Sequence, residues 1–260
     1  MIKFENTEVL GWEHAIRGMR NPMNSWDKSD SEFHREPKHY FDENDIPCAD
    51  LRRFVIGPND LDLMKRLRNA GTDHRKFMRM ITVYVDITAP LYWWKEFDTY
   101  KVGTVANSCS TMHKIADKEF NLEDFSCEHL FNVEHDLPSY PTVNGLSCTS
   151  ISILEHVVNA LNCYRKLYLE TRLEPYWWQM IQLLPSSYNQ KRTVMMNYEV
   201  LANIYKSRRN HKLDEWCLHD TPPEHEFRNK DFTSGMWGFC DWIETLPYSE
   251  LITGKRFYND

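Results

Sequence analysis

The sequence has no long apolar run, no run of basic residues and no Cys-x-x-Cys pair. Without an apolar run there is no membrane-spanning helix, and the N-terminus lacks the apolar core of a signal peptide, so we expect a cytoplasmic protein with no membrane partner. Lys and Arg number 31 against 38 Asp and Glu, a net charge of −7. An acidic chain without a basic run is unsuited to duplex nucleic acid, whereas a few local cations suffice for one nucleotide phosphate.

The 7 cysteines are spread along the chain without the regular spacing of a disulfide framework, and we interpret them as reduced thiols. Two short groups approach the spacing of a metal site: Cys127, His129 and His135, and then Cys217, His219 and His225. Neither group has the paired ligands of a structural zinc site. Spacing alone therefore predicts no metal.

Apolar material for a large core is present, since 42% of the residues are hydrophobic and 9 are Trp. We find no internal repeat and interpret residues 1–260 as a single domain. Residues 27–50 are polar, charged and poor in aliphatic side chains. We expect them to form an extended loop or an insertion.

The periodicity of the apolar residues indicates one clear strand and several helices. Apolar residues at every second position predict a strand over residues 81–88, and Pro90 then fits the first turn of an aromatic-rich helix. A helix is expected after Pro58, with Asn59 or Asp60 as its cap, and another from a capping box at Ser152 to about residue 171. Three more are expected from Pro175 to before Pro185, over about residues 192–208, and around Trp237–Leu246. The fold class is α+β, with a central mixed or antiparallel sheet flanked by helices.

Two segments resemble the flavin-dependent thymidylate synthases, in the same order along the chain. The first runs from His74 through the predicted strand and Pro90 to Thr111, where that family has a His, a strand, a Pro-started helix and the signature RHRxxSxNExSxR. The second, residues 183–208, is similar to the family's Leu-Pro segment and the helix after it. The resemblance implies the family's fold and a homotetramer whose active sites combine several subunits.

The signature is only partly kept. The RHR triplet falls on Thr99-Tyr100-Lys101, the phosphate-binding Arg falls on Thr111, and an Arg between two helical Asn falls on Glu199. For cofactor binding the resemblance implies His74, Lys101, Asn107, Asn197 and Asn203, and for substrate binding Thr104, Cys109, Gln182 and Arg208. On a helix over 192–208, Asn197 and Arg208 would share a face, because eleven residues bring them within about 20°. No catalytic residue is assigned, since in this family the flavin carries the chemistry.

The resemblance implies reductive methylation of dUMP to dTMP, with FAD as cofactor and with methylenetetrahydrofolate and NADPH as co-substrates. The partner is then dUMP or a related pyrimidine nucleotide. Because signature cations are missing, two alternatives stay open. One is a repurposed or inactive nucleotide-binding protein, and the other is an enzyme that places a different group on C5 of a pyrimidine nucleotide. So divergent a member is expected of a phage or mobile element.

Overall fold

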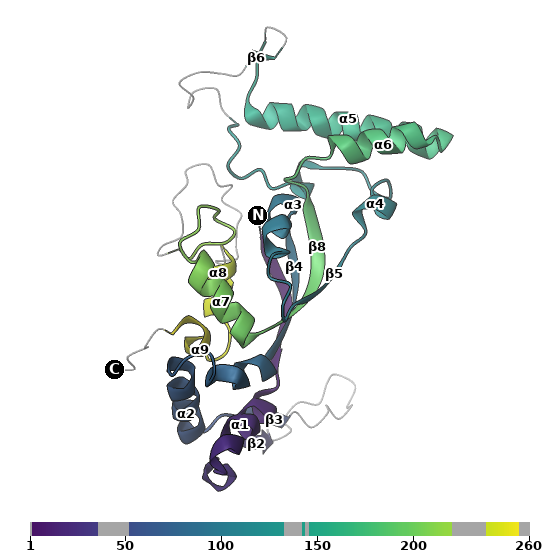
Figure 1. Cartoon of the computed structure of the whole chain (residues 1–260). Helices are drawn as coiled ribbons and strands as arrows, with labels where there is room; N and C mark the ends of the chain where they lie inside the picture. The colour runs from purple at the N-terminus through teal and green to yellow at the C-terminus, as the bar shows by residue number, and fades with distance from the viewer. Residues whose placement is uncertain (1, 36–51, 133–141, 144–145, 220–237, 255–260) are drawn as a thin grey trace, which may run out of the picture.

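The computed structural model describes residues 2–35, 52–132, 142–143, 146–219 and 238–254 (Figure 1). Its central sheet has four strands in the order β1-β4-β8-β5, each antiparallel to its neighbours. The bounds are Lys3–Leu10 for β1, Thr82–Pro90 for β4, Val105–Ser108 for β5 and Asn189–Asn197 for β8. Helices surround this sheet, so the predicted α+β class with an antiparallel sheet is confirmed.

One face of the sheet is buried in the main core. The alternation in β4 places Val83, Val85 and Ile87 at 1% exposure or less, while Tyr84 on the other face is 42% exposed. The same core includes buried residues of α3 (Leu91–Phe97), α7 (Tyr198–Arg208), α8 (Phe239–Glu244) and α9 (Glu250–Thr253), and also of the two N-terminal helices described below. As predicted, α3 starts directly after Pro90.

Aromatic rings fill the centre of this core. The ring of Trp93 stacks on that of Trp216 with centroids 4.5 Å apart, and Phe239 lies 5.4 Å from Trp216. All three side chains are fully buried. Such a cluster contributes both apolar burial and specific ring geometry, so it fixes how α3 and α8 pack.

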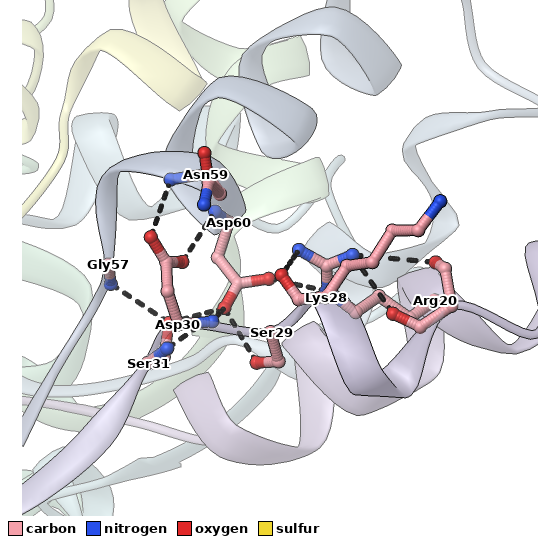
Figure 2. Close-up of polar contacts among 9 residues, drawn as sticks. Arg20, Lys28, Ser29, Asp30, Ser31, Gly57, Asn59 and Asp60 are labelled. Atoms are coloured by element: carbon pink, nitrogen blue, oxygen red, sulfur yellow. Dashed lines mark hydrogen bonds and ion pairs between the residues drawn. The ribbon is translucent and has the colours of Figure 1, made fainter.

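A buried ion pair joins the two N-terminal helices, α1 (Trp12–Arg20) and α2 (Pro58–Asn69). Figure 2 shows Asp60 between Arg20 on one side and the segment Ser29–Ser31 on the other. Arg20 Nε donates to Asp60 Oδ1 at 2.6 Å, and the hydroxyls of Ser29 and Ser31 donate to Asp60 Oδ2 at 2.7 Å. Every Asp60 oxygen is thus satisfied, which compensates for burying the charge.

The cap of α2 differs from the prediction. Neither Asn59 nor Asp60 caps the helix; instead the Asp30 carboxylate accepts from the backbone N–H groups of both residues, at 2.9 and 3.0 Å (Figure 2). The helix is therefore capped through a tertiary contact, by a residue some thirty positions earlier in the sequence. Between α1 and β4 the chain also forms three short 3₁₀ turns, η1 (Asn21–Met23), η2 (Trp26–Lys28) and η3 (Arg75–Met80).

A second buried cluster lies around the helical pair α5 (Ser150–Thr171) and α6 (Glu174–Leu183). Leu161 of α5 and Met180 of α6 are fully buried there. The short elements α4 (Thr111–Lys114) and η4 (Leu122–Asp124) belong to the same part of the chain. Figure 1 shows the pair at one end of the sheet and α1 and α2 at the other. None of the described helices has the length and apolar content to cross a bilayer.

Several predicted boundaries were wrong. Residues 192–197 finish β8 instead of starting a helix, because Val194 and Met196 alternate into the core as strand residues do. The cap of α5 is Thr149, whose hydroxyl accepts from the Ser152 N–H, so the capping box at Ser152 is absent. Within the expected loop, Glu32–Arg35 forms β2 and pairs with β3 (Arg52–Val55).

Some elements of the structure were not predicted, and some predicted segments lie outside the described residues. Strand β1 and helix α1 were not predicted, nor was the small hairpin of β6 (Thr142–Val143) and β7 (Leu146–Ser147). Residues 36–50 of the expected loop, and Trp237 at the start of the expected C-terminal helix, lie outside the described residues. The described part of that helix is α8.

Candidate functional site

The loop that follows α3 turns back onto the first residues of α7. Gly103 has φ +80°, and a Cβ there would lie 2.9 Å from the Val200 side chain and 3.1 Å from Asn197 Nδ2. Glycine is therefore required both by the backbone conformation and by the close approach. This contact brings two predicted site residues of the loop, Lys101 and Thr104, beside a third, Asn197. We call Lys101, Thr104 and Asn197 the α3–α7 site; the predicted residue Arg208 lies at the other end of α7, about 16 Å along the helix.

Asn197 is the last residue of β8 and the N-cap of α7. Its Oδ1 accepts from the backbone N–H of Val200 at 3.0 Å, so its Nδ2 remains directed toward the loop at Gly103. Thr104 Oγ1 donates to the Tyr100 carbonyl at 2.5 Å and keeps acceptor capacity. Lys101 is exposed. Because Asn197 caps α7 and lies outside it, the predicted shared helix face with Arg208 was wrong.

Arg208 ends α7 and is held by side chains of the chain itself. Its Nη1 lies 2.7 Å from Glu96 Oε2, its Nε donates to the Tyr100 hydroxyl at 2.8 Å, and its guanidinium lies 4.9 Å from the Trp216 ring centroid. The side chain is 17% exposed. The charge of the predicted phosphate-binding arginine is thus already balanced by a carboxylate.

Two cations on β8 are paired in the same manner. Arg192 Nη1 lies 2.8 Å from Asp98 Oδ1, with its guanidinium 4.2 Å from the Trp94 ring centroid. Lys191 Nζ lies 3.0 Å from Glu5 Oε2 and 3.4 Å from Asp86 Oδ2. Lys101 is exposed and takes part in no ion pair with another described residue, and the same holds for Lys206 and Arg209 at the end of α7.

The open face of the sheet carries a polar network. Asp86 accepts from the Thr193 hydroxyl at 2.6 Å and from Asn6 Nδ2 at 2.9 Å. These hydrogen bonds, together with nearby Lys191, lower the pKa of Asp86. The network spans β1, β4 and β8 and keeps this face polar.

His74 and Asn203 lie on another side of α7. His74 is exposed and directly precedes Arg75, whose Nε lies 2.9 Å from Glu199 Oε2 and whose Nη2 donates to Asn203 Oδ1 at 3.2 Å. Sequence reasoning missed Arg75. A signal existed, because Glu199 stands where the family has an Arg, and a buried carboxylate there needs a cation nearby.

The remaining predicted residues do not join the α3–α7 site within one chain. Asn107 is exposed on the edge strand β5 opposite Thr193, and Cys109 follows that strand, also exposed. Gln182 is exposed on α6, which precedes β8, whereas Asn197 ends β8. A nine-residue strand is about 30 Å long, so β8 separates Gln182 from Asn197 by roughly that distance.

No protein-family model and no curated protein matches this sequence. Among solved structures, one of thymidylate synthase X from Helicobacter pylori, with FAD and dUMP, aligns over 98% of both chains at 14% identity and a TM-score of 0.54. Another, of the flavin-dependent thymidylate synthase ThyX from the same organism with the same two ligands, aligns over 81% of this chain and 86% of the other, at 15% identity and a TM-score of 0.51. The chain has the fold of these proteins, as the sequence resemblance implied.

Proposed function

We propose that this protein is a divergent flavin-dependent thymidylate synthase, which methylates dUMP using FAD, methylenetetrahydrofolate and NADPH. The observation that carries the proposal is the meeting of the two segments that resemble the family. Residues 101–104 lie against the start of α7, and Arg75, next to His74, contacts Glu199 and Asn203 of the same helix. The likeness over 98% of a chain solved with FAD and dUMP supports it.

The residues at α7 fit a nucleotide through one cation and several neutral polar groups. Lys101 would balance a phosphate, while Thr104 and Asn197 would hydrogen-bond to it or to the sugar. His74 and Asn203 would hold the flavin from the other side of the helix. FAD, when bound, supplies the hydride chemistry, and the side chains bind and orient. Arg208 fits a phosphate only if the phosphate replaces Glu96.

The distribution of the polar residues favours a site shared between subunits. Gln182 lies away from Lys101 within one chain, because the length of β8 separates α6 from the start of α7, and Asn107 and Cys109 are exposed along and after the edge strand β5. A homotetramer in which one subunit presents α6 or β5 to the α7 of another would bring them together. Sedimentation of the purified protein tests this, since a monomer that turns over dUMP would contradict a shared site.

A second candidate is a nucleotide-binding protein that has lost catalysis. The specific observation in its favour is that Arg208, Arg192 and Arg75 all form ion pairs within the chain. Neutralised arginines attract the phosphates of FAD less strongly, and each lost charged contact costs about 1.5–3 kcal/mol of binding. A third candidate, transfer of a different group to C5, is distinguished by the mass of the product.

The deciding experiment is an absorbance titration of the full-length protein with FAD, with and without dUMP. A flavin spectrum perturbed by the protein and then by dUMP, followed by dUMP-dependent oxidation of reduced flavin and formation of dTMP, is the expected result. Binding of dUMP without flavin would establish the second candidate. If neither ligand binds, the proposal is wrong.

A matched pair of variants locates the nucleotide. Lys101→Ala should weaken dUMP binding about tenfold, because it removes an exposed cation from the α3–α7 site. Lys95→Ala removes another exposed lysine, on α3, and should leave the affinity unchanged. Equal effects of the two variants would place the nucleotide elsewhere.

A further inference from the structure

The segment after α7 turns back on itself before the chain reaches α8. Trp216 points into the core, and the backbone N–H of Phe239 donates to the Glu215 carbonyl at 2.8 Å. Gly238 packs against the same segment, since a Cβ there would lie 2.5 Å from the Cys217 carbonyl oxygen and 2.6 Å from that of Asp214. The side chains of Asp214, Cys217 and His219 gather on this turn and are half-buried.

The three side chains offer ligand atoms at the separation that a tetrahedral ion needs. Cys217 Sγ lies 3.4 Å from His219 Nε2, His219 Nε2 lies 4.0 Å from Asp214 Oδ1, and all three ligand atoms lie within 4.8 Å of one another. Zinc bonds of 2.0–2.3 Å in a tetrahedron place the ligand atoms about 3.3–3.8 Å apart. One ion therefore fits between them with small side-chain adjustments.

The orientation of His219 is an independent sign of a metal ligand. Its Nδ1 lies 2.6 Å from Asp241 Oδ2, and its backbone N–H donates to Asp241 Oδ1 at 2.9 Å. A carboxylate at Nδ1 holds the proton on that nitrogen, so the neutral ring presents the Nε2 lone pair to Cys217 and Asp214. Metal-binding histidines are commonly oriented by a carboxylate in this manner.

A second histidine, from a distant part of the sequence, contacts the same aspartate. His129 Nε2 lies 3.3 Å from Asp214 Oδ2. This histidine belongs to the first Cys/His group of the sequence, and Cys217 and His219 belong to the second. The other two members, His135 and His225, lie outside the described residues. The fold has therefore brought together one histidine of each group.

We propose that Asp214, Cys217 and His219 bind one Zn²⁺ ion, with the fourth position left to water and His129 holding the second oxygen of Asp214. Thiolate, imidazole and carboxylate together suit zinc, which is tetrahedral and binds nitrogen, sulfur and oxygen. His129 orients the Asp214 carboxylate, as polar groups around metal ligands commonly do. The proposed ion fixes the turn that carries Trp216, and it departs from the sequence-based expectation of no metal.

A Cys–His–Asp nucleophilic triad would use three of the same side chains. It accounts for Cys217, His219 and Asp241 but gives no role to Asp214, which faces the same imidazole nitrogen as the thiol. The carboxylates of Asp214 and Asp241 surround Cys217 with negative charge, which disfavours a thiolate unless a cation lies between them. A divalent ion balances that charge.

The first test is the metal content of the full-length protein purified without chelator and measured by elemental mass spectrometry. We expect about one zinc ion per chain. Cys217→Ala and His219→Ala should lose it, whereas Cys163→Ala, an exposed cysteine on α5, should retain it. Asp241→Asn should lower the zinc affinity by about 10- to 100-fold, because it removes the group that orients His219.

The second test does not depend on any variant folding. The chelator-treated wild-type protein is titrated with Co²⁺ alone, and we expect visible bands of tetrahedral cobalt with a thiolate charge-transfer band at one equivalent. A wild-type protein that holds no zinc and gives no such spectrum would overturn the proposal. So would rapid alkylation of Cys217 at neutral pH that Zn²⁺ does not slow, since that result identifies the triad. Neither readout depends on dUMP or FAD binding.

Discussion

Glu96 on α3 and Arg208 at the end of α7 form an ion pair across 112 residues of sequence, with Nη1 and Oε2 2.7 Å apart. The Glu96 carboxylate is therefore bound to the guanidinium of Arg208, which the family resemblance assigns to the substrate phosphate. His211 Nε2 lies 3.5 Å from the same Glu96 oxygen and 2.8 Å from Arg208 Nη1, so the pair is part of a small polar cluster. A nucleotide that uses Arg208 must compete with Glu96.

The first prediction concerns this competition. Glu96→Gln removes the charge that balances Arg208 and keeps the shape of the side chain, so dUMP should bind about fivefold more tightly, on the order of 1 kcal/mol. Calorimetric titration measures the change. Asp62→Asn, which breaks the exposed pair with Arg66 on α2, is the control and should have no effect. Unchanged affinity in Glu96→Gln would mean that Arg208 does not contact the nucleotide.

The second prediction concerns the pair of Arg75 and Glu199. Both side chains are largely buried, at 16% and 9% exposure, so Glu199→Arg places two cations together and should lower the free energy of unfolding by about 3 kcal/mol. Arg75→Glu combined with Glu199→Arg should recover part of that loss, as chemical denaturation would show. A double variant no more stable than the worse single variant would contradict the pairing.

The third prediction concerns Asp60. Asp60→Asn leaves the buried guanidinium of Arg20 without its counter-charge, which costs about 3–5 kcal/mol of unfolding free energy. Asp62→Asn, two residues away and exposed, should change stability by less than about 0.5 kcal/mol. Urea denaturation at pH 7 compares the two variants. A similar small loss in both would show that the Arg20–Asp60 pair contributes little.

The fourth prediction is the pH dependence that the same carboxyl imposes. Burial alone would raise the pKa of Asp60, but hydrogen bonds from Ser31 and Ser29 and the Arg20 guanidinium outweigh it, so the pKa falls below its ordinary value of 3.8. The unfolded chain then binds the proton more readily. The stability contributed by Asp60 is fully present above pH 3.8 and is lost as the pH falls through the folded-state pKa.

Unfolding measured from pH 5 downward checks this sign. The wild-type protein should lose stability more steeply with acid than Asp60→Asn, because the variant no longer titrates at this position. Parallel slopes for the two proteins in that window would show that the Asp60 pKa is not lowered.

What the sequence could reveal depended on whether the signal was local. Strand β4 and helix α3 were predicted because an alternating apolar pattern and Pro90 are local signals. Strand β8 was interpreted as the start of a helix, since Asn197 caps α7 directly after the strand, with no turn residues between them. Strand β1 lies at the edge of the sheet with mostly polar, exposed residues, so its pattern gave little sign of a strand.

The candidate site was less predictable for the same reason. Its positions Lys101, Thr104 and Asn197 followed from the resemblance, and Gly103 brings them together. The partner of Arg208 could not be foreseen, because Glu96 pairs with it only through the tertiary packing of α3 on α7. Spacing singled out Cys217, His219 and His129 but did not predict a metal site, because Asp214 is a carboxylate outside Cys/His patterns and the two groups are remote in sequence.

The strand order β1-β4-β8-β5 has a consequence for how the chain folds during synthesis. The short strand β5 pairs only with β8 in the central sheet, although β8 begins 81 residues after β5 ends, at Asn189 against Ser108. Until β8 leaves the ribosome, β4 exposes an unpaired edge and β5 has no place in the sheet. Closing so long a loop is slow, so the nascent chain exposes an unpaired strand edge from the end of β4 at Pro90 until β8 is complete at Asn197, and truncated products ending before β8 should aggregate.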